Sequence, residues 1–487
     1  MLFLGKSFMV LLLRIKTRLF YQQMHAFWSL QKKNDFRFVL GICSFLLGLV
    51  YLWLFCDESL LKPDSLGYIN FSSQRSLGYP LFLKGIHFLF HSYEPIPSLQ
   101  IFFFCFSAYF LSASFLQMTR SSLLSIILLF ALLFNIPFAK LSFSLLTDSP
   151  AQSFLMMGLA LTIKASQSKE TKYYYGLCLV VGMAALIRPL SIILCLLPLG
   201  LSFFQGSSLK EKLSKQVIIG FFVIASFLLL GSTAQFFRHG FFKTEAFLGH
   251  NLIGKALIAI PTEDVLNSPF PNTRKESVAV QLVLNKAPSL HLKYLLTSPY
   301  YDTIRQRVSS ETPSLPPSEQ DDFWKKAAIS LIKGSPKAYL GDIWMNYWAL
   351  WQLGDLCTYQ EDGDFKSYLE THTPLPIMGT YQEPEMRHKF NQKLGNPFIV
   401  YGIRMMLGLG FILSLLIPLL SLIYKFRKKP ISNPLVLGTL SALTLQAGFI
   451  AIACTQAGLG RYALSFWPCL CILFLSTLTL FMDHKHK

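Results

Sequence analysis

The run RFVLGICSFLLGLVYLWLFC (residues 37–56) decides the class of fold, because its only charged side chain is Arg37 at the very start. About twenty apolar residues in a helix cross the roughly 30 Å of hydrocarbon in a bilayer. Two carboxylates, Asp57 and Glu58, follow directly, so the run ends at a polar boundary. The pattern predicts a membrane-spanning helix.

Similar runs recur along the chain, which is 52% hydrophobic and only 14% charged. Soluble domains carry about a quarter charged residues, so the composition excludes an ordinary soluble fold. We expect an all-α polytopic membrane protein with about ten transmembrane helices. The expected spans are 37–56, 96–116, 122–138, 150–164, 174–187, 189–205, 216–236, 397–424, 434–455 and 463–482.

The formal net charge of +18 lies in short segments between the apolar runs, which excludes nucleic acid as the partner. Cytoplasmic loops of membrane proteins collect Lys and Arg. An even number of spans with cytoplasmic N- and C-termini puts most basic residues on that side. These residues are Lys6, Arg14, Lys16, Arg18, Lys32, Lys33, Arg120, Lys164, Lys169, Lys172, Lys210, Lys212, Lys215, the KFRKK cluster at 425–429, Lys485 and Lys487.

This topology divides the chain into four parts. Residues 1–36 form a cytoplasmic amphipathic N-terminus, and 37–236 a transmembrane core whose first outer loop is 57–95. Residues 237–396 form an outer, periplasmic domain, and 397–487 the last transmembrane helices. Within the outer domain we expect a loop at 311–322. An aromatic helix at 339–353 is expected to lie at the membrane interface or to form the wall of a lipid-substrate groove.

The sequence contains no phosphate-binding glycine loop, dinucleotide fingerprint, nucleophile elbow or His-Glu-x-x-His motif. The nine cysteines lack metal-ligand spacing and lie mostly in or beside apolar runs, so we interpret them as small core residues. Nucleotide-driven and zinc chemistry are therefore unsupported.

Acidic residues near a membrane are costly unless they are solvated, paired or functional. Asp57 and Glu58 could simply mark the exit of the first span. Asp64 in KPDSLGY and Asp148 in LTDSPAQ are either helix caps or catalytic groups, because both stand at expected helix starts on the outer face. Two such carboxylates could converge on one pocket as general base, metal ligand or orienter of a hydroxyl.

Two arginines share that outer face. Arg188 in ALIRPLSII lies between two short spans, and Arg461 in GRYALSFWP precedes the last span. Arginine is suited to bidentate phosphate contacts, while the alternative for both is an interaction with lipid headgroups.

The segments PDSLGYI, RSLGYPLFL, LTDSPAQ, LIRPLSIILCLLPL and GRYALSFWP occur in this order. In order and sidedness they resemble the GT-C class of integral-membrane glycosyltransferases, which includes protein O-mannosyltransferases and aminoarabinose transferases of lipid A. The resemblance covers about 37–236 and 397–482; residues 237–396 match no motif of the class. It implies transfer of a sugar, with inversion, from a polyprenyl-phosphate donor to an acceptor hydroxyl on the outer face of the membrane.

The resemblance also implies roles for individual residues. Asp64 would be the catalytic base, with Asp57 as its competitor because CDES also supplies an acidic pair. Asp148 would be the second acidic residue, and Arg188 and Arg461 would bind the donor phosphate. Tyr68 and Tyr462 are expected to bind substrate. Some members of the class use Mg²⁺ or Mn²⁺ and others do not; Asp64, Asp148 and Glu58 are the candidate ligands.

A different class of function stays open. O-antigen ligases or polymerases and transporters of lipid-linked glycans also have many spans, and ligases place basic and His residues in a large outer loop. Here that segment holds Arg238, His239, Arg305 and Arg307. We expect a multi-pass protein of a bacterial inner membrane. The expected partners are the bilayer and the lipid-linked donor, and the sugar and acceptor (lipid, glycan or protein) are left unspecified.

Overall fold

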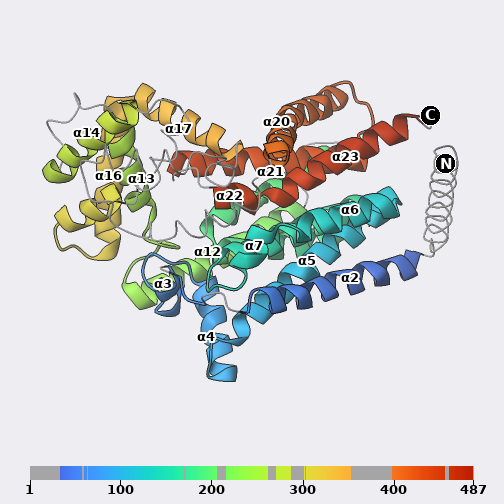
Figure 1. Cartoon of the computed structure of the whole chain (residues 1–487), viewed down its shortest axis with the longest axis horizontal. Coiled ribbons are helices and arrows are strands. Elements are labelled where there is room, and N and C mark those ends of the chain that lie inside the picture. Colours follow the sequence, from blue (N-terminus) through green and yellow to red (C-terminus); the bar gives the residue numbers. More distant parts are fainter. Residues whose placement is uncertain are drawn as a thin grey trace, which may run out of the picture.

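The computed structural model is helical throughout the residues that it describes, and most of the helices form one elongated bundle (Figure 1). This confirms the all-α fold. The described residues are 33–56, 60–62, 64–168, 170–205, 215–260, 270–286, 301, 303–351, 397–455 and 460–485. The predicted amphipathic helix at 1–32 lies outside them.

The helices of the N-terminal half follow one another with short connections. They are α2 (Lys33–Leu54), α3 (Ser65–Ile69), α4 (Gly78–Phe90), α5 (Pro95–Thr119), α6 (Ser122–Leu133), α7 (Ile136–Leu141), α8 (Asp148–Ser168), α9 (Thr171–Ile187), the 3₁₀ helix η1 (Pro189–Cys195), α10 (Leu196–Gln205) and α12 (Lys215–His239). The rest are α13 (Leu248–Ala259), α14 (Pro271–Lys286), α16 (Pro317–Gly334), α17 (Pro336–Trp351), α20 (Pro397–Phe426), α21 (Asn433–Thr455), α22 (Gly460–Ser465) and α23 (Trp467–Lys485).

Within the described residues, five helices are long and apolar enough to cross a membrane. They run over Phe36–Leu54, Pro95–Thr119, Val217–His239, Met405–Phe426 and Asn433–Thr455. Shorter apolar helices cover Ser122–Leu133, Thr171–Ile187, Pro189–Phe204 and Trp467–Met482. Length and composition thus support a membrane protein, while the count of ten spans and the sidedness of the loops stay predictions.

Three of the expected continuous spans are interrupted. The expected span 122–138 is divided at Asn135, because α6 ends at Leu133 and Pro137 lies in the first turn of α7. The segment from 189 starts as a 3₁₀ helix with Pro189 at its first position and becomes α-helical at Leu196. The expected span 463–482 is divided into α22 and α23 between Ser465 and Trp467.

The bundle is organised around α5 and α8, which pack against each other along their length. Helix α5 also packs against α2 and α6, and α8 packs against α9. The interior is mainly aliphatic and aromatic, and the cysteines that the structure describes are all free thiols. Helix α2 begins and α23 ends at the same end of the bundle (Figure 1).

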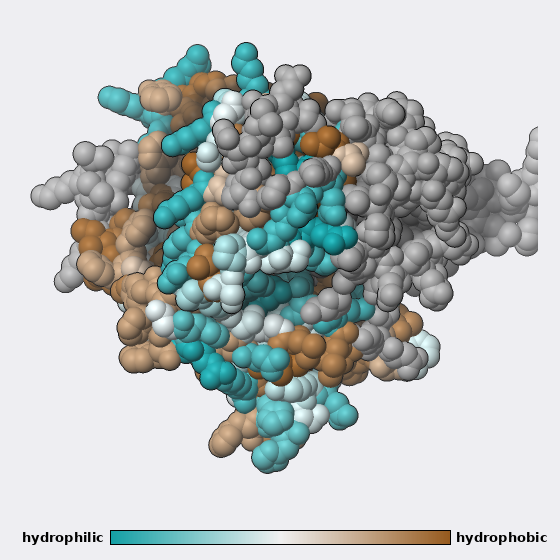
Figure 2. Space-filling model, turned by 90° about the vertical axis from the view of Figure 1, so that its left-hand side faces the viewer, coloured by the Kyte–Doolittle hydropathy of each residue, from teal (hydrophilic) through white to brown (hydrophobic). Residues whose placement is uncertain are grey.

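A second hydrophobic core lies beyond the other end of the bundle, in α13, α14, α16 and their neighbours (Figure 1). Its centre includes Leu257, Ile304 and Trp324, all nearly inaccessible to solvent. Hydrophilic side chains gather on this end of the molecule (Figure 2). The loop predicted at 311–322 is shorter than expected, because Pro316 and Pro317 begin α16 well before Asp322.

The predicted aromatic helix at 339–353 is α17, and its tryptophans do not share one environment. Trp344 is exposed, whereas the ring of Trp348 lies 4.8 Å from that of Phe411. Trp351 is buried against Phe411 and Phe449. Two of the three expected interfacial anchors therefore pack against the bundle, because α17 lies against α20 and α21.

An ion pair ties α13 to α17. Lys255 Nζ lies 2.7 Å from Asp342 Oδ2, and the two side chains are only 3% and 8% exposed. The same carboxylate accepts a hydrogen bond of 3.0 Å from Asn346 Nδ2. Buried charges need such partners, so this pair fixes the second core relative to the helix that packs on the bundle.

Candidate functional site

The four-residue sequence SLGY occurs twice, at 65–68 and 76–79, and both copies build the same region. The serines anchor the two copies: Ser65 Oγ donates to Leu145 O at 3.0 Å, and Ser76 Oγ donates to Ile187 O at 2.7 Å. The rings of Tyr68 and Tyr79 meet edge to face, with their centroids 5.2 Å apart. The short repeat therefore fastens the region around α3 and α4 to the segments that precede α8 and follow α9.

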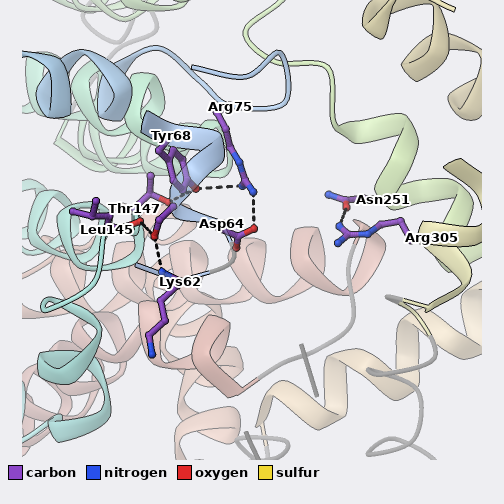
Figure 3. Close-up of polar contacts among 9 residues, drawn as sticks. Lys62, Asp64, Tyr68, Arg75, Leu145, Thr147, Asn251 and Arg305 are labelled. Carbon is purple, nitrogen blue, oxygen red and sulfur yellow. Dashed lines mark hydrogen bonds and ion pairs between the residues drawn. The ribbon is translucent and has the colours of Figure 1, made fainter. Parts of the chain in front are cut away.

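Asp64 lies immediately before α3, but its side chain makes no capping hydrogen bond to that helix. Instead Arg75 Nη2 donates to Asp64 Oδ1 at 2.6 Å (Figure 3). Gly67 leaves room for this arginine, because a Cβ at that position would lie 3.0 Å from Arg75 Nε. Of the two readings of Asp64, the cap is wrong, because the carboxylate is engaged by a guanidinium instead.

Asp148 begins α8, as the Thr-Asp-Ser-Pro sequence predicts, and its carboxylate turns to a second arginine. Arg188 Nη1 donates to Asp148 Oδ1 at 2.8 Å, and the Asp148 side chain is 8% exposed. The guanidinium of Arg188 also lies 5.4 Å from the ring centre of Tyr462. Three of the residues singled out in the sequence are thus brought together from α8, the α9–η1 junction and α22.

Tyr68 lies between the Asp64–Arg75 pair and the residue that precedes α8. Its hydroxyl lies 3.1 Å from Thr147 Oγ1, next to Asp148, and accepts a long hydrogen bond of 3.4 Å from Arg75. The Arg75 guanidinium also lies 4.6 Å from the centre of the Tyr68 ring. Burial raises the pKa of Tyr68, so the phenol stays protonated and can donate within this network.

A small cavity of about 30 Å³ lies beside Arg188 and Tyr462. Gln152, 2% exposed, lines it, and its Nε2 donates to Leu464 O at 3.0 Å. That bond directs the amide oxygen the other way, where Oε1 finds no partner among the described residues. The cavity has the size and polarity to hold water or a hydroxyl group.

The loop between α12 and α13 closes over the Asp64–Arg75 pair. Ala246 N donates to Ser73 O at 2.9 Å, and Gln235 Nε2 donates to Arg75 O at 2.7 Å. The ring centre of Phe247 lies 5.6 Å from the Arg75 guanidinium and 5.4 Å from that of Arg305. In Figure 3, Arg305 and its partner Asn251 stand opposite Asp64 and Arg75.

Sequence reasoning missed two charged residues of this site. Arg75 was visible in RSLGYP, where its position ahead of the second SLGY was the available signal. Glu245 lies in the loop between α12 and α13, and no motif marks it. Burial raises the pKa of Glu245 to about 7, against the opposing influence of Arg75 and Arg188 and with the help of the Asp321 charge.

Other predicted site residues are not placed by the structure. Asp57 and Glu58 lie outside the described residues, and so does the side chain of Arg461, whose backbone belongs to α22. In the part of the chain that is described, no three His, Cys, Asp or Glu side chains gather as a metal-ligand set. Asp64 and Asp148 are engaged by different arginines and do not form a common ligand pair, so we derive no step through a metal.

A much larger groove, of about 750 Å³, lies away from these charges. It is lined by apolar side chains of α10, α12, α20 and α21, including Phe204, Phe221 and Leu422. The α12 residues that line it are near the start of that helix, whereas Gln235 at its other end contacts Arg75. An apolar groove can hold a hydrocarbon chain but supplies no acid or base, so the charged cluster is the candidate site.

No family model, curated protein or solved structure matches the chain significantly.

Proposed function

We propose that this protein is a GT-C-type membrane glycosyltransferase, which transfers a sugar with inversion from a polyprenyl-phosphate donor to an acceptor hydroxyl. The observation that carries the proposal is the pair of carboxylate–arginine contacts, Asp64–Arg75 and Asp148–Arg188, with Tyr68 between Arg75 and the residue before Asp148. This arrangement places cationic donors next to oxygen acceptors at the start of separate helices. The GT-C resemblance of the sequence supports the same reading.

The chemistry of the transfer explains why such a cluster is useful. When the acceptor oxygen attacks C1 of the sugar, the bond from C1 to the phosphate oxygen breaks, and its electron pair leaves with the lipid phosphate. Fixed guanidinium groups stabilise the charge that develops on that phosphate. Arg188 serves this role, and the resemblance adds Arg461 to it. A carboxylate on the opposite side of the sugar accepts the proton, and the resemblance assigns this role to Asp64 or Asp57.

The setting in the membrane fits a lipid-linked donor. Several apolar helices pack beside the charged cluster, so a prenyl chain can stay in hydrocarbon while its phosphate reaches the arginines. We place the site at the outer face of a bacterial inner membrane, because the sequence puts most basic segments on the other side.

A transfer assay in lipid vesicles tests the proposal. The purified protein is given a radiolabelled polyprenyl-phosphate monosaccharide and a mixture of lipid and glycan acceptors. We expect Asp148→Asn to reduce transfer about 100-fold or more, because Arg188, which contacts the developing charge in the transition state, loses the carboxylate that orients it. Glu170→Gln is the matched control, because Glu170 forms an exposed ion pair with Lys172 that is remote from the site. The proposal fails if the wild type transfers no label, or if Asp148→Asn behaves like the control.

A second candidate function rests on Arg305. This residue comes from the long segment 237–396 and shares the Phe247 ring with Arg75, and His239 Nε2 lies 2.9 Å from Phe71 O in the same region. Basic residues of a large outer segment at the site favour an O-antigen ligase or polymerase over a monosaccharide transferase. Such an enzyme would use a diphosphate-linked oligosaccharide and leave the monophosphate-linked monosaccharide unused.

A further inference from the structure

Glu245 is held next to the site by its neighbours in the chain. The residue before it, Thr244, accepts a hydrogen bond of 3.3 Å through its carbonyl from Gln235, whose amide also donates to Arg75 O. The residue after it, Ala246, donates its backbone N–H to Ser73 O at 2.9 Å. Because both flanking residues are tied to the Arg75 loop, the position of Glu245 beside that loop is fixed by the backbone.

The surroundings of Glu245 combine dense protein with access to solvent. Its side chain is half-buried. Three charged groups from three different parts of the fold act on it: Arg75 from the loop after α3, Arg188 from the α9–η1 junction and Asp321 from α16. No guanidinium hydrogen-bonds to its carboxylate among the described residues. Burial holds the pKa of this group at about 7, the range in which a carboxylate is an efficient proton acceptor at neutral pH.

The other two described carboxylates of the site are differently engaged. One oxygen of Asp64 accepts from Arg75 at 2.6 Å, and one oxygen of Asp148 accepts from Arg188 at 2.8 Å. An oxygen bonded to a guanidinium has that lone pair committed. The two pairs are therefore suited to orienting the arginines. Glu245, which is tied by the backbone on either side of it to the Arg75 loop, is the described carboxylate of the site that such a bond does not occupy.

We propose that Glu245 is the catalytic base of the transfer, which rests on the proposed function and moves the base away from Asp64. The Glu245 carboxylate takes the proton of the acceptor hydroxyl as that oxygen forms its bond to C1 of the sugar. The bond between C1 and the phosphate oxygen breaks, and both electrons leave with the polyprenyl phosphate. Arg188 faces the leaving phosphate, and Glu245 then releases its proton to solvent, which reaches its half-buried side chain.

The pH dependence of transfer tests this assignment in vesicles, with the polyprenyl-phosphate monosaccharide as donor. The wild-type kcat/KM is expected to rise with pH and level off above about pH 7, as Glu245 ionises. Glu245→Gln is expected to lose at least 100-fold in kcat/KM together with the rising limb. Glu245→Asp keeps a carboxylate and recovers part of the rate, which separates a catalytic role from a folding defect.

A second pair of variants tests the pH at which kcat/KM rises, without changing a residue of the site. The charge of Asp321 raises the pKa of Glu245, so Asp321→Asn should move the rising limb to lower pH. Asp321 also accepts from Gly249 N at 2.8 Å, a bond that the amide oxygen of asparagine can keep. The control is Asp322→Asn, because Asp322 pairs with Lys243 and does not act on Glu245.

The outcomes separate the two proposals. If the wild type transfers sugar and Glu245→Gln has the same rate and pH profile, Glu245 is not the base, while the proposed glycosyltransferase function stands. If the rise of kcat/KM with pH disappears in Asp64→Asn but persists in Glu245→Gln, Asp64 is the base. If the wild type transfers no sugar from any of the donors, the proposed function and this assignment fall together.

Discussion

Gly78 and Gly85 lie in the same helix, α4, and replacing each by alanine should change stability in opposite directions. A Cβ at Gly78 would lie 2.8 Å from Leu186 O and 2.9 Å from Ile187 N, both of them backbone atoms that cannot rotate away. At Gly85 no atom lies within 4 Å of the same added carbon. The same substitution, glycine to alanine, thus meets a steric conflict at position 78 and none at position 85.

The magnitudes follow from these contacts. Overpacking against a fixed backbone costs about 1–3 kcal/mol, and Gly78→Ala should lose that amount. Gly85→Ala should gain about 0.5–1 kcal/mol, because alanine is the better helix former and meets nothing. The conflict at Gly78 also pushes α4 away from the end of α9, next to Arg188, so this variant should lose transfer activity as well.

Thermal unfolding followed by tryptophan fluorescence in detergent measures both effects. The expected order of melting temperatures is Gly85→Ala above the wild type and Gly78→Ala below it. Equal melting temperatures for the two variants, or a more stable Gly78→Ala, would refute the close approach of α4 to α9.

Three further predictions concern other contacts. Lys255→Met leaves Asp342 buried without its cation and should cost about 3–5 kcal/mol, and adding Asp342→Leu should restore part of this in the same unfolding assay. Burial and the Arg305 charge lower the pKa of His250 to about 4. The free energy of unfolding that this shift contributes above about pH 6.5 should therefore be lost as the pH falls toward 4. His250→Phe should flatten this dependence of the unfolding free energy on pH. Tyr68→Phe removes the hydroxyl between the two ion pairs and should lower kcat/KM about tenfold, while Tyr109→Phe, in α5, should leave it unchanged; equal effects of the two would contradict the bridging role of Tyr68.

Much of the bundle could be predicted from the sequence, because apolar runs and helix-start signals are local. Apart from the three interrupted segments, the expected spans coincide with helices, and α8 begins at Asp148, where Thr147 and Pro150 predict it. The breaks at Asn135 and after Ser465 were missed, because hydropathy averages over a window and does not register where a helix bends.

The candidate site was predictable only in its members. Asp148, Arg188 and Tyr462 were singled out by type and position, and the structure brings them together. The pairing of Asp64 with Arg75 depends on the path of the loop after α3. The position of Glu245 depends on the hydrogen bonds from the Gln235 side chain to Thr244 O and from Ala246 N to Ser73 O. Contacts that are set by tertiary packing leave no periodic trace in a sequence, so neither the partner of Asp64 nor the place of Glu245 could be predicted.

The Phe247 ring lies near both Arg75 and Arg305 and so links the charged cluster to the helices of the second hydrophobic core. Arg305 is further attached to Asn251 of α13. A macromolecule that tilts α13 on docking would therefore displace the aromatic ring first and the Arg75 guanidinium with it. The Phe247 side chain therefore couples the position of α13 to the position of the Arg75 guanidinium.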